Sequence, residues 1–374
     1  MKIQSAIDLV LESREGLTFD DVTLIPEYSY VKSRKDVSTK TKLCGNLSLS
    51  TPLIPANMDT ITGPKMARCC SSVGSIGFLH RFSDRAIMLE EFFANENTDG
   101  IKKLPLLIGL SIGLSDSEEY ISELVREYWR VSDFVFLLDV ANAHNEYVLK
   151  KIDSIKKDIL NTRLIVGNVA TPEAVISVLN SGADGVKIGI GNGGLCETRL
   201  RTGVGVPQFS AIALCANAIN EWKNRTRSTT RPCLIADGGI RYPGDIMKAL
   251  GAGADLCMSG YLFAGTQETP GRVIRKGLFP NEVSYKVYRG SASASSKNDR
   301  SENSNIEGNA IEIPMNGSAK YVFQQVKEGI QSGLSYCGYD GVQDFIGNGM
   351  FARVSQSSII EAQPHAMRRH YESR

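Results

Sequence analysis

The chain has 374 residues, of which 42% are hydrophobic, with a formal net charge of +1 and eight cysteines. This size and apolar content are typical of a soluble globular protein, and the balanced charge favours neither a nucleic-acid nor a membrane partner. No apolar run reaches the ~18 residues that a membrane span needs. The N-terminus carries charges where an export signal needs an apolar core, and the cysteines follow no disulfide or zinc spacing. We therefore expect a cytoplasmic protein.

The first 47 residues are mostly polar and irregular, and we expect them to form an N-terminal segment that packs on the main domain. Within it, residues 16–22 (Gly-Leu-Thr-Phe-Asp-Asp-Val) predict a loop that leads into a short strand. Residues 31–35 are basic and hydroxylated, which indicates either a solvated turn or a phosphate contact.

From residue 48 onward short apolar runs recur, and stretches with helical periodicity follow them. The runs lie at residues 52–55, 75–79, 105–109, 134–139, 164–168, 185–189, 233–237 and 254–260. The helical stretches include residues 67 onward, 117–128, 146–157, 172–180, 210–222 and 244–250. Continuous apolar runs indicate strands covered on both faces, and hence a parallel sheet.

Eight strand–helix units predict an α/β fold, a (β/α)8 TIM barrel, with one catalytic domain over residues 48–374. A doubly wound open sheet is the alternative, but it predicts a GxGxxG fingerprint that the first units lack. In a barrel the chemistry gathers where the strands end. The polar residues at the predicted strand ends are Asn57, Asp59, His80, Arg81, Asp139, Asn142, Asn168, Cys196 and Asp237.

The segment after the eighth unit contains residues 290–317, which are rich in Ser, Asn and Gly. Such a composition buries little apolar surface and predicts a mobile flap. Residues 318–332 return to a helical pattern, and a C-terminal extension with a basic, solvated tail follows.

The most informative stretch is residues 187–199, an apolar strand that breaks into glycines and presents Cys196, with Thr198 two residues later. Glycines allow the loop to approach a ligand closely, and a cysteine presented there is a candidate nucleophile. The alternative is a buried cysteine that acts as a small hydrophobe. Gly191, Gly193 and Cys196 also offer backbone carbonyls to a monovalent cation such as K+.

Asp237-Gly238-Gly239 and Gly260-Tyr261 close the seventh and eighth strands, where many barrels bind phosphate through backbone amides. Asp237 is then expected to bond ribose hydroxyls, because it would repel a phosphate. Alternatively, Asp237 caps the next helix. His80 and Arg81 indicate either an anion site or simple surface exposure.

Several segments together resemble the IMP dehydrogenase/GMP reductase family. They are residues 16–22, residues 56–60, the cysteine stretch, residues 202–208 (Thr-Gly-Val-Gly-Val-Pro-Gln) and residues 235–241 (Ile-Ala-Asp-Gly-Gly-Ile-Arg). The resemblance covers nearly the whole chain. It implies a purine mononucleotide substrate (GMP or IMP), a nicotinamide cofactor, a covalent intermediate at purine C2 and a homotetramer.

The chain resembles GMP reductase most, which implies NADPH-dependent conversion of GMP to IMP and ammonia. The short link between the second and third strands excludes the regulatory CBS modules that dehydrogenases usually insert there, and Ser301 follows Arg300 where the dehydrogenase has a tyrosine. Residues 264–271, 288–290 and 361–365 resemble the dehydrogenase instead. An NAD-dependent IMP dehydrogenase without CBS modules is therefore the alternative, and a non-enzymatic nucleotide-binding protein is a third reading.

We expect Cys196 to attack C2 of guanine, with Thr198 and Glu307 as acid–base partners and Glu307 swinging in from the flap. The expected substrate residues are Asp237, Gly238, Gly239, Gly260, Tyr261, Gly290, Ser291 and Ala292. By resemblance, the cofactor residues are Ser33, Arg34, Arg81, Asp139, Val140, Ala141, Ile190 and Gly191. The cysteine loop departs from the family pattern at Asn192, Gly194 and Glu197, where proline, serine and threonine are usual.

Overall fold

A computed structural model describes residues 2–94, 106–128, 132–159, 162–278, 280–299 and 306–363. Eight parallel strands form one sheet in the order β5-β12-β11-β10-β9-β8-β7-β6. The strands are β5 (Leu53–Pro55), β6 (Phe78–Leu79), β7 (Leu106–Ile112), β8 (Ser132–Asp139), β9 (Leu164–Val169), β10 (Gly185–Ile188), β11 (Cys233–Asp237) and β12 (Leu256–Ser259). This is the predicted (β/α)8 barrel; its ladder is interrupted in the described residues only between β5 and β6.

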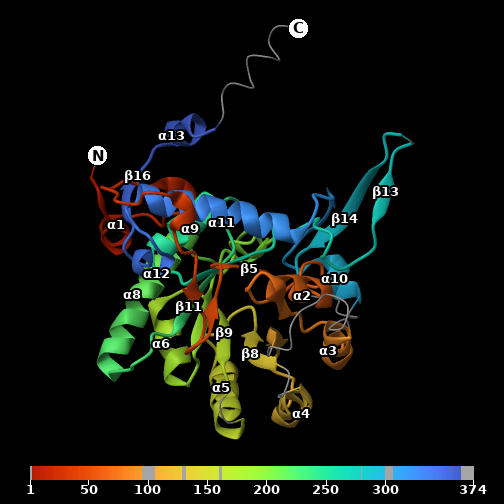
Figure 1. Cartoon of the computed structure of the whole chain (residues 1–374). Helices are drawn as coiled ribbons and strands as arrows, with labels where there is room; N and C mark the ends of the chain where they lie inside the picture. Colours follow the sequence, from red (N-terminus) through yellow and green to blue (C-terminus); the bar gives the residue numbers. More distant parts are fainter. Residues whose placement is uncertain are drawn as a thin grey trace.

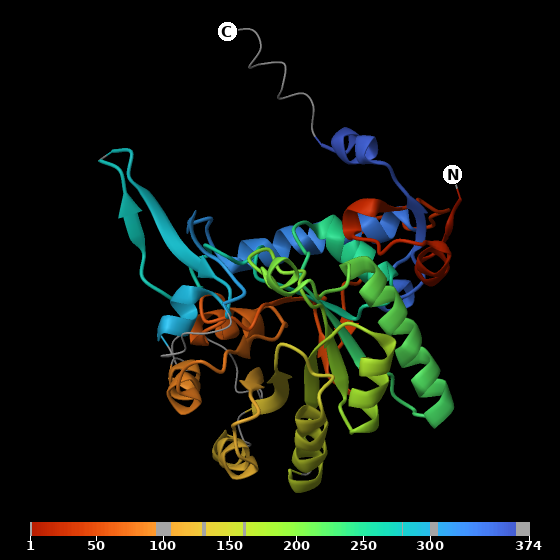
Figure 2. The same cartoon turned by 180° about the vertical axis from the view of Figure 1, so that it is seen from behind.

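Helices surround the strands, as Figures 1 and 2 show from opposite sides. They are α2 (Pro64–Ser72), α3 (Arg85–Phe93), α4 (Glu118–Tyr128), α5 (Glu146–Asp158), α6 (Pro172–Asn180), α7 (Thr198–Thr202), α8 (Gln208–Thr226), α9 (Pro243–Gly251) and α11 (Ala319–Tyr336). Their starts follow from local chemistry. At α6, for example, Thr171 accepts a hydrogen bond from the Ala174 amide, and Pro172 occupies the first turn.

The core divides into two buried layers because alternate residues of a strand face opposite sides of the sheet. The barrel interior is filled by one set of side chains, among them Ile54, Phe78, Val135, Leu137, Ile165, Ile235 and Met258. Leu43 and Leu49 close one end of this interior from the hairpin of β3 (Thr41–Lys42) and β4 (Ser48–Leu49). The second, larger layer lies between strands and helices.

The N-terminal segment has more regular structure than its composition predicts. It contains β1 (Gln4–Ser5), α1 (Ala6–Glu12), the 3-10 helices η1 (Phe19–Asp21) and η2 (Arg34–Asp36), and β2 (Val22–Leu24). β1 and β2 both pair with β16 (Met350–Arg353) near the other end of the chain. This pairing is long-range, so local sequence patterns give no signal for it. The proposed boundary at residue 47 stays a prediction.

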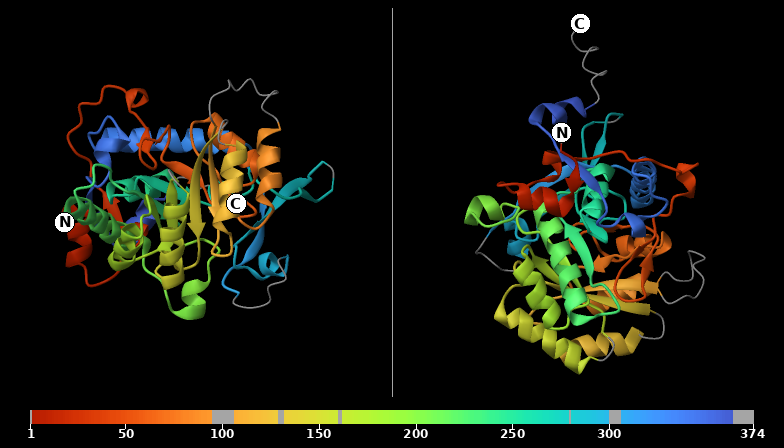
Figure 3. Two further views of the ribbon diagram at one scale, coloured as in Figure 1. Left: turned by 90° about the horizontal axis from the view of Figure 1, so that it is seen from below. Right: turned by 90° about the vertical axis from the view of Figure 1, so that its left-hand side faces the viewer.

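The segment predicted as a mobile flap also contains regular structure. α10 (Ala294–Asp299) and β15 (Ala310–Pro314) lie within it, and β15 pairs with β14 (Val283–Arg289), which pairs with β13 (Ile274–Lys276). The hairpin of β13 and β14 projects from the barrel in both views of Figure 3. Two short helices, α12 (Val342–Phe345) and α13 (Gln356–Glu361), flank β16. No helix in the described ranges is long and apolar enough to cross a membrane.

Candidate active site

The cysteine loop follows β10 and precedes α7, so it lies where a barrel presents its chemistry. Gly189 and Gly191 have φ values of 145° and 81°, a region that side chains with a Cβ rarely adopt. These glycines turn the chain away from the sheet and leave Cys196 partly exposed, whereas the seven other cysteines are buried. The alternative that Cys196 is a buried hydrophobe is therefore wrong.

A chain of hydrogen bonds leads from the sulfur to a carboxylate. Cys196 Sγ donates to Thr198 Oγ1 at 3.1 Å, and Thr198 Oγ1 donates to Glu307 Oε2 at 2.8 Å. This geometry gives a path by which a thiol proton can pass to a carboxylate through one hydroxyl.

The flap already lies on the cysteine loop. The Glu197 amide donates to the Glu307 carbonyl at 2.8 Å, and the Asn309 amide donates to the Leu195 carbonyl at 3.0 Å. Cys196 and Gly308 face each other in an antiparallel bridge. Glu307 is thus within reach of Thr198 without the swing that we expected from the sequence. The Arg300–Ser301 pair, used in the sequence comparison, lies outside the described residues.

The structure gives physical roles to two residues that depart from the family pattern. Glu197 accepts a hydrogen bond from Asn309 Nδ2 at 2.7 Å and pairs with Arg201 at 2.8 Å, so it ties the flap to the loop. These contacts lower the pKa of the Glu197 carboxyl. Asn192 Nδ2 donates to the Val206 carbonyl and to Gln208 Oε1 at 2.9 and 2.7 Å, which fixes the loop from inside.

The loop of Asp237-Gly238-Gly239 lies directly beside the cysteine loop. Gly238 has φ of 98°, and a Cβ there would stand 3.0 Å from the backbone of Asn192 and Gly193. Gln208 Nε2 donates to the carbonyls of both Ile188 and Asp237 at 3.0 Å, joining the ends of β10 and β11. The structure therefore brings the predicted phosphate loop and the predicted nucleophile together.

Lys187 is a functional candidate that the sequence analysis missed. Its ammonium is 3% exposed and lies 2.6 Å from Asp237 Oδ2 and 3.4 Å from Asp139 Oδ1. Burial opposes its charge, but the attraction of both carboxylates outweighs burial and raises the pKa of Lys187. A lysine within an apolar strand was the available signal, because a buried charge needs partners.

We expected the Asp237 carboxylate to be free for ribose hydroxyls, but one of its oxygens already accepts two hydrogen bonds from the protein. Its Oδ2 accepts from Lys187 and also from Asn168 Nδ2 at 3.0 Å. The orientation of the carboxylate is therefore fixed before any ligand arrives. The alternative role as a helix cap is not seen: α9 begins after Tyr242, and its capping carboxylate is Asp245.

Arg81 and Asp139 also meet at this end of the barrel. Arg81 Nε lies 3.6 Å from Asp139 Oδ2, which is too long for a hydrogen bond, and this buried N–H has no hydrogen-bond partner in the described structure. His80 is 5% exposed, so the interpretation of His80 as a surface residue is wrong. Burial lowers the pKa of His80, so the ring is neutral near pH 7 and does not bind an anion by charge.

Three further residues of the predicted substrate site, Gly260, Gly290 and Ala292, lie in two different layers of the structure. Gly290 and Ala292 lie in the flap layer, where the Gly290 amide donates to the Asn309 carbonyl and the Ala292 carbonyl accepts from the Glu307 amide, both at 2.9 Å. Gly260 faces Tyr288, whose Oη would lie 2.7 Å from a Cβ at that position. Burial, with a smaller effect of the Asp237 charge, raises the pKa of Tyr288 to about 12.

Arg34 lies against α11 rather than at the cysteine loop. It donates to Tyr336 Oη at 2.9 Å and to Ser332 Oγ at 3.4 Å. Within the described part of this chain no contact joins it to Cys196, so the cofactor roles of Ser33 and Arg34 stay predictions. The carbonyl site for K+ also stays a prediction; no His, Cys, Asp and Glu side chains of the described ranges group into a metal site.

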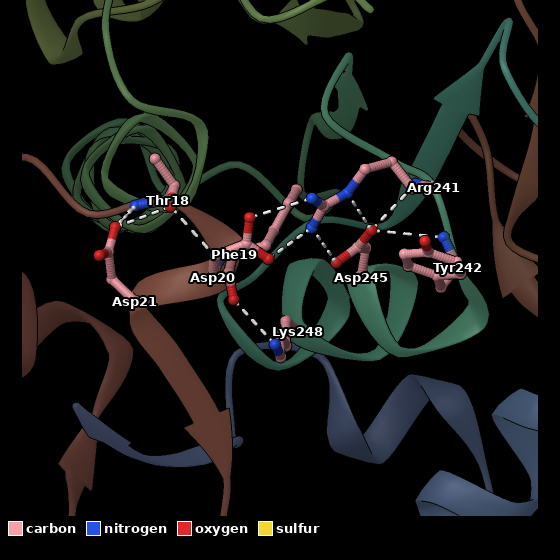
Figure 4. A network of polar contacts seen from close by, with 8 residues as sticks. All are labelled: Thr18, Phe19, Asp20, Asp21, Arg241, Tyr242, Asp245 and Lys248. Atoms are coloured by element: carbon pink, nitrogen blue, oxygen red, sulfur yellow. Dashed lines mark hydrogen bonds and ion pairs between the residues drawn. The ribbon is translucent and has the colours of Figure 1, made fainter. Parts of the chain in front are cut away.

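The N-terminal loop at residues 17–20 forms hydrogen bonds with α8, which follows the cysteine loop, and hydrogen bonds and an ion pair with Arg241 and α9, which follow the Asp237 loop. Figure 4 shows Arg241 between Asp20 and Asp245, with Nη2 2.6 Å from Asp20 Oδ1 and Nε 3.2 Å from Asp245 Oδ2. Lys248 Nζ donates to the Phe19 carbonyl at 2.8 Å. On the other side, Leu17 and Ser210 exchange hydrogen bonds, which joins the loop to α8.

Comparison with known proteins identifies the family of the chain. The family model described as "IMP dehydrogenase / GMP reductase domain" matches residues 16–365. The chain is 36% identical to a GMP reductase of Lactobacillus acidophilus, over 87% of this chain and 91% of that protein. It is 33% identical to inosine-5'-monophosphate dehydrogenases of Borreliella burgdorferi and Cryptosporidium parvum. Those matches cover 94% of this chain and 97% and 95% of the two relatives. The chain therefore belongs to the IMP dehydrogenase/GMP reductase family.

Proposed function

We propose that this member of the family is a GMP reductase, an oxidoreductase that converts GMP to IMP and ammonia with NADPH. The observation that carries the proposal is the unbroken chain from Cys196 through Thr198 to Glu307. A reductive deamination needs a nucleophile for C2 and a proton for the departing amine. One relay serves both needs.

The steps balance in protons. The Cys196 thiol loses its proton through Thr198 to Glu307, and the thiolate forms a bond to C2 of the guanine. The same relay returns that proton to the amino group, which leaves as ammonia and gives a thioether adduct. When the adduct is reduced at C2, the carbon–sulfur bond breaks, and the released thiolate takes up a proton from solvent to restore the thiol. The flap residues that pair with the cysteine loop lie beside Cys196 and would limit the access of water during these steps.

The residues around Arg81 fit a phosphorylated nicotinamide cofactor. Among the residues that the structure describes, Arg81 has a buried N–H without a hydrogen-bond partner, and its side chain is 34% exposed, so the guanidinium can reach a ligand oxygen. An unsatisfied cationic donor suits a phosphate or ribose oxygen. Bound NADPH would supply the hydride that replaces the amino group at C2. In this chain Asp139, held by Lys187, would orient the neighbouring part of the cofactor.

The nucleotide itself would lie over the loop after β11. Gly238 and Gly239, both with positive φ, allow close approach of their amides to the ligand. The fixed carboxylate of Asp237 suits the ribose hydroxyls, and Gly260, Tyr261 and the flap residues 290–292 would complete the nucleotide site. Tyr288 stays a neutral hydroxyl, since its pKa is raised to about 12.

An IMP dehydrogenase that oxidises IMP with NAD is the second candidate, and one observation favours it. The chain aligns with nearly the full length of two relatives named as dehydrogenases. The alignment with the first of them spans 410 positions against 94% of this chain, so a dehydrogenase relative differs from this chain by insertions of only some tens of residues in total. The short connection between β6 and β7 therefore does not separate the two activities, and this weakens one argument from the sequence.

A spectrophotometer separates the candidates. We expect loss of NADPH absorbance with GMP and formation of IMP and ammonia, and no formation of NADH from IMP and NAD. Formation of NADH and XMP from IMP, without consumption of NADPH by GMP, would overturn the assignment in favour of the dehydrogenase. Binding of GMP with neither reaction would leave only a nucleotide-binding protein.

We further propose a cytoplasmic homotetramer with a K+ ion held by the carbonyls of Gly191, Gly193 and Cys196. Light scattering should then give about four times the 40.8 kDa of one chain. Replacement of K+ by Na+ should lower turnover, because the carbonyls that fix the cysteine loop would lose a matching ion. Equal turnover in both salts would contradict the cation site.

A further inference from the structure

A cavity of about 700 Å³ lies at the end of the barrel opposite the cysteine loop. It is bordered by the β3–β4 hairpin and by the residues that precede β11 and β12, whereas Cys196 and Asp237 stand where strands end. Its helices α1, α8 and α12 gather on the left of Figure 1, away from β14 and α10 on the right. This volume falls in the range of small-molecule sites.

The lining of this basal cavity is positively charged. Lys42, Lys223 and Arg231 contribute cations, and Asp255 is the only acidic residue among the lining residues. Asp255 is already engaged, because its Oδ2 accepts from Arg231 and, at 2.7 Å, from the Leu234 amide. Neither lysine has a carboxylate within ion-pair distance among the described residues. The uncompensated charge therefore favours an anion.

The central guanidinium is held in place before any ligand binds. Arg231 Nη2 donates to the Gly253 carbonyl at 2.9 Å, and Nε donates to Asn220 Oδ1 at 3.0 Å, in addition to the pair with Asp255. Because these acceptors engage all three nitrogens of the guanidinium, the N–H groups that remain on Nη1 and Nη2 keep a defined direction. A fixed guanidinium in a cavity that two lysines also line suits the recognition of a phosphate.

The rest of the cavity suggests that the ligand has an organic part. Leu43, Ala213, Ala216 and Ile346 form an apolar portion of the wall. Hydroxyl and amide side chains supply the polar portion, namely Ser5, Asn46, Ser48, Asn217, Asn220, Thr229, Thr230 and Gln343. A single inorganic ion would leave most of this space to water.

We propose that the basal cavity binds a phosphorylated small molecule of up to nucleotide size, with the phosphates at Lys42, Lys223 and Arg231. This site is separate from the active site, and the proposal does not depend on which family reaction the chain performs. Attraction between partly exposed charges is screened by salt, so the binding should weaken as ionic strength rises.

The test measures binding of ATP by calorimetry to the full chain with the active site saturated by GMP. Inorganic pyrophosphate serves as a second probe without an organic part. We expect one ATP per chain, and loss of about three- to tenfold in affinity with each of Lys42→Gln and Lys223→Gln, since each removes a charge-assisted contact. Lys327→Gln removes an exposed lysine of α11, outside the cavity, and is the matched control.

The outcomes divide cleanly. The site is supported if ATP binds, with or without pyrophosphate, and if the two cavity variants weaken this binding while the control does not. If ATP binds and pyrophosphate does not, the apolar wall contributes to the affinity. If neither ATP nor pyrophosphate binds, the proposal is overturned. Binding that the cavity variants leave unchanged also overturns it. Lys42 is exposed and Lys223 is half-buried without an ion-pair partner among the described residues, so we expect both variants to fold, which circular dichroism checks. Failure of the proposed reductase activity would not alter the readout.

Discussion

The two ends of the barrel each present cysteine, and they differ in what surrounds the sulfur. Cys196 stands on a glycine-rich loop, partly exposed, with a hydroxyl and a carboxylate in line behind it. At the other end Cys44 and Cys233 lie with their sulfurs 3.5 Å apart, and both are almost fully buried. The hydrogen bond between the two thiols and burial raise the pKa of Cys233 well above its usual value. The same side chain is therefore a candidate nucleophile at one end and packing at the other.

We expect the largest difference between the two ends when Cys196 or Cys44 is replaced by alanine. Cys196→Ala should lower turnover by at least about 10³-fold, because no other group can form the covalent intermediate, and nucleotide binding should persist. Cys44→Ala should retain turnover and lower the free energy of unfolding by about 1 kcal/mol through the space left in the core. Steady-state kinetics and denaturant unfolding measure both. Near wild-type turnover in Cys196→Ala would exclude the covalent route.

Lys187 tests whether the catalytic end depends on buried charge. Lys187→Met should lower the free energy of unfolding by about 3 kcal/mol, because Asp139 and Asp237 would lose their common cation. Lys187→Arg keeps the charge and should recover part of the loss. Urea unfolding monitored by circular dichroism gives the values. Equal stability of the methionine variant and the wild type would mean that solvent already compensates both carboxylates.

Glu307 tests the acid–base relay. Glu307→Gln keeps the size and the hydrogen bond from Thr198 but removes the proton acceptor, so turnover should fall about 10²-fold with little change in GMP affinity. Glu312→Gln, on the neighbouring strand β15, is a matched control that should leave turnover unchanged. An unchanged rate in Glu307→Gln would move the acid–base role to another group.

A substitution at Gly194 is expected to raise the affinity for GMP rather than to lower it. A Cβ at this position meets no atom within 4 Å. The resemblance seen in the sequence implies a serine in its place. Gly194→Ser should therefore be accommodated, add a phosphate donor and tighten GMP binding by at least about tenfold, since one hydrogen bond to a charged group contributes ~1.5 kcal/mol or more. Gly194→Ala is the control without a hydroxyl. Equal affinities of the two variants would place the phosphate elsewhere.

Asp20 is expected to have the smallest effect. Its pair with Arg241 is substantially exposed, so Asp20→Asn should cost less than about 1 kcal/mol of stability. The Arg241 guanidinium lowers the pKa of Asp20 from its ordinary 3.8. The advantage of the wild type should therefore be present above pH 3.8 and disappear as the pH falls through the lowered pKa. A difference that persists unchanged in acid would indicate packing rather than charge.

The sequence predicts the barrel well and its connections less well. Apolar runs such as residues 164–168 and 233–237 are strands because burial on both faces leaves a local signature. The pairing of β15 with β14 and of Gly308 with Cys196 depends on residues far apart in the chain, so the flap was not predicted to contain them. Cys196, Asp237 and Gly238 were found from local chemistry, whereas the buried contact of Lys187 with Asp139 and Asp237 requires the strand register.

The most direct test of the central claim is peptide mass spectrometry after acid quench of the enzyme mixed with GMP and, separately, with IMP and NADP+. The account predicts a purine nucleotide attached to the peptide that contains Cys196, and no adduct on the peptides that contain Cys44 or Cys233. Rapid turnover without an adduct at any quench time, or an adduct on a different cysteine, would contradict it.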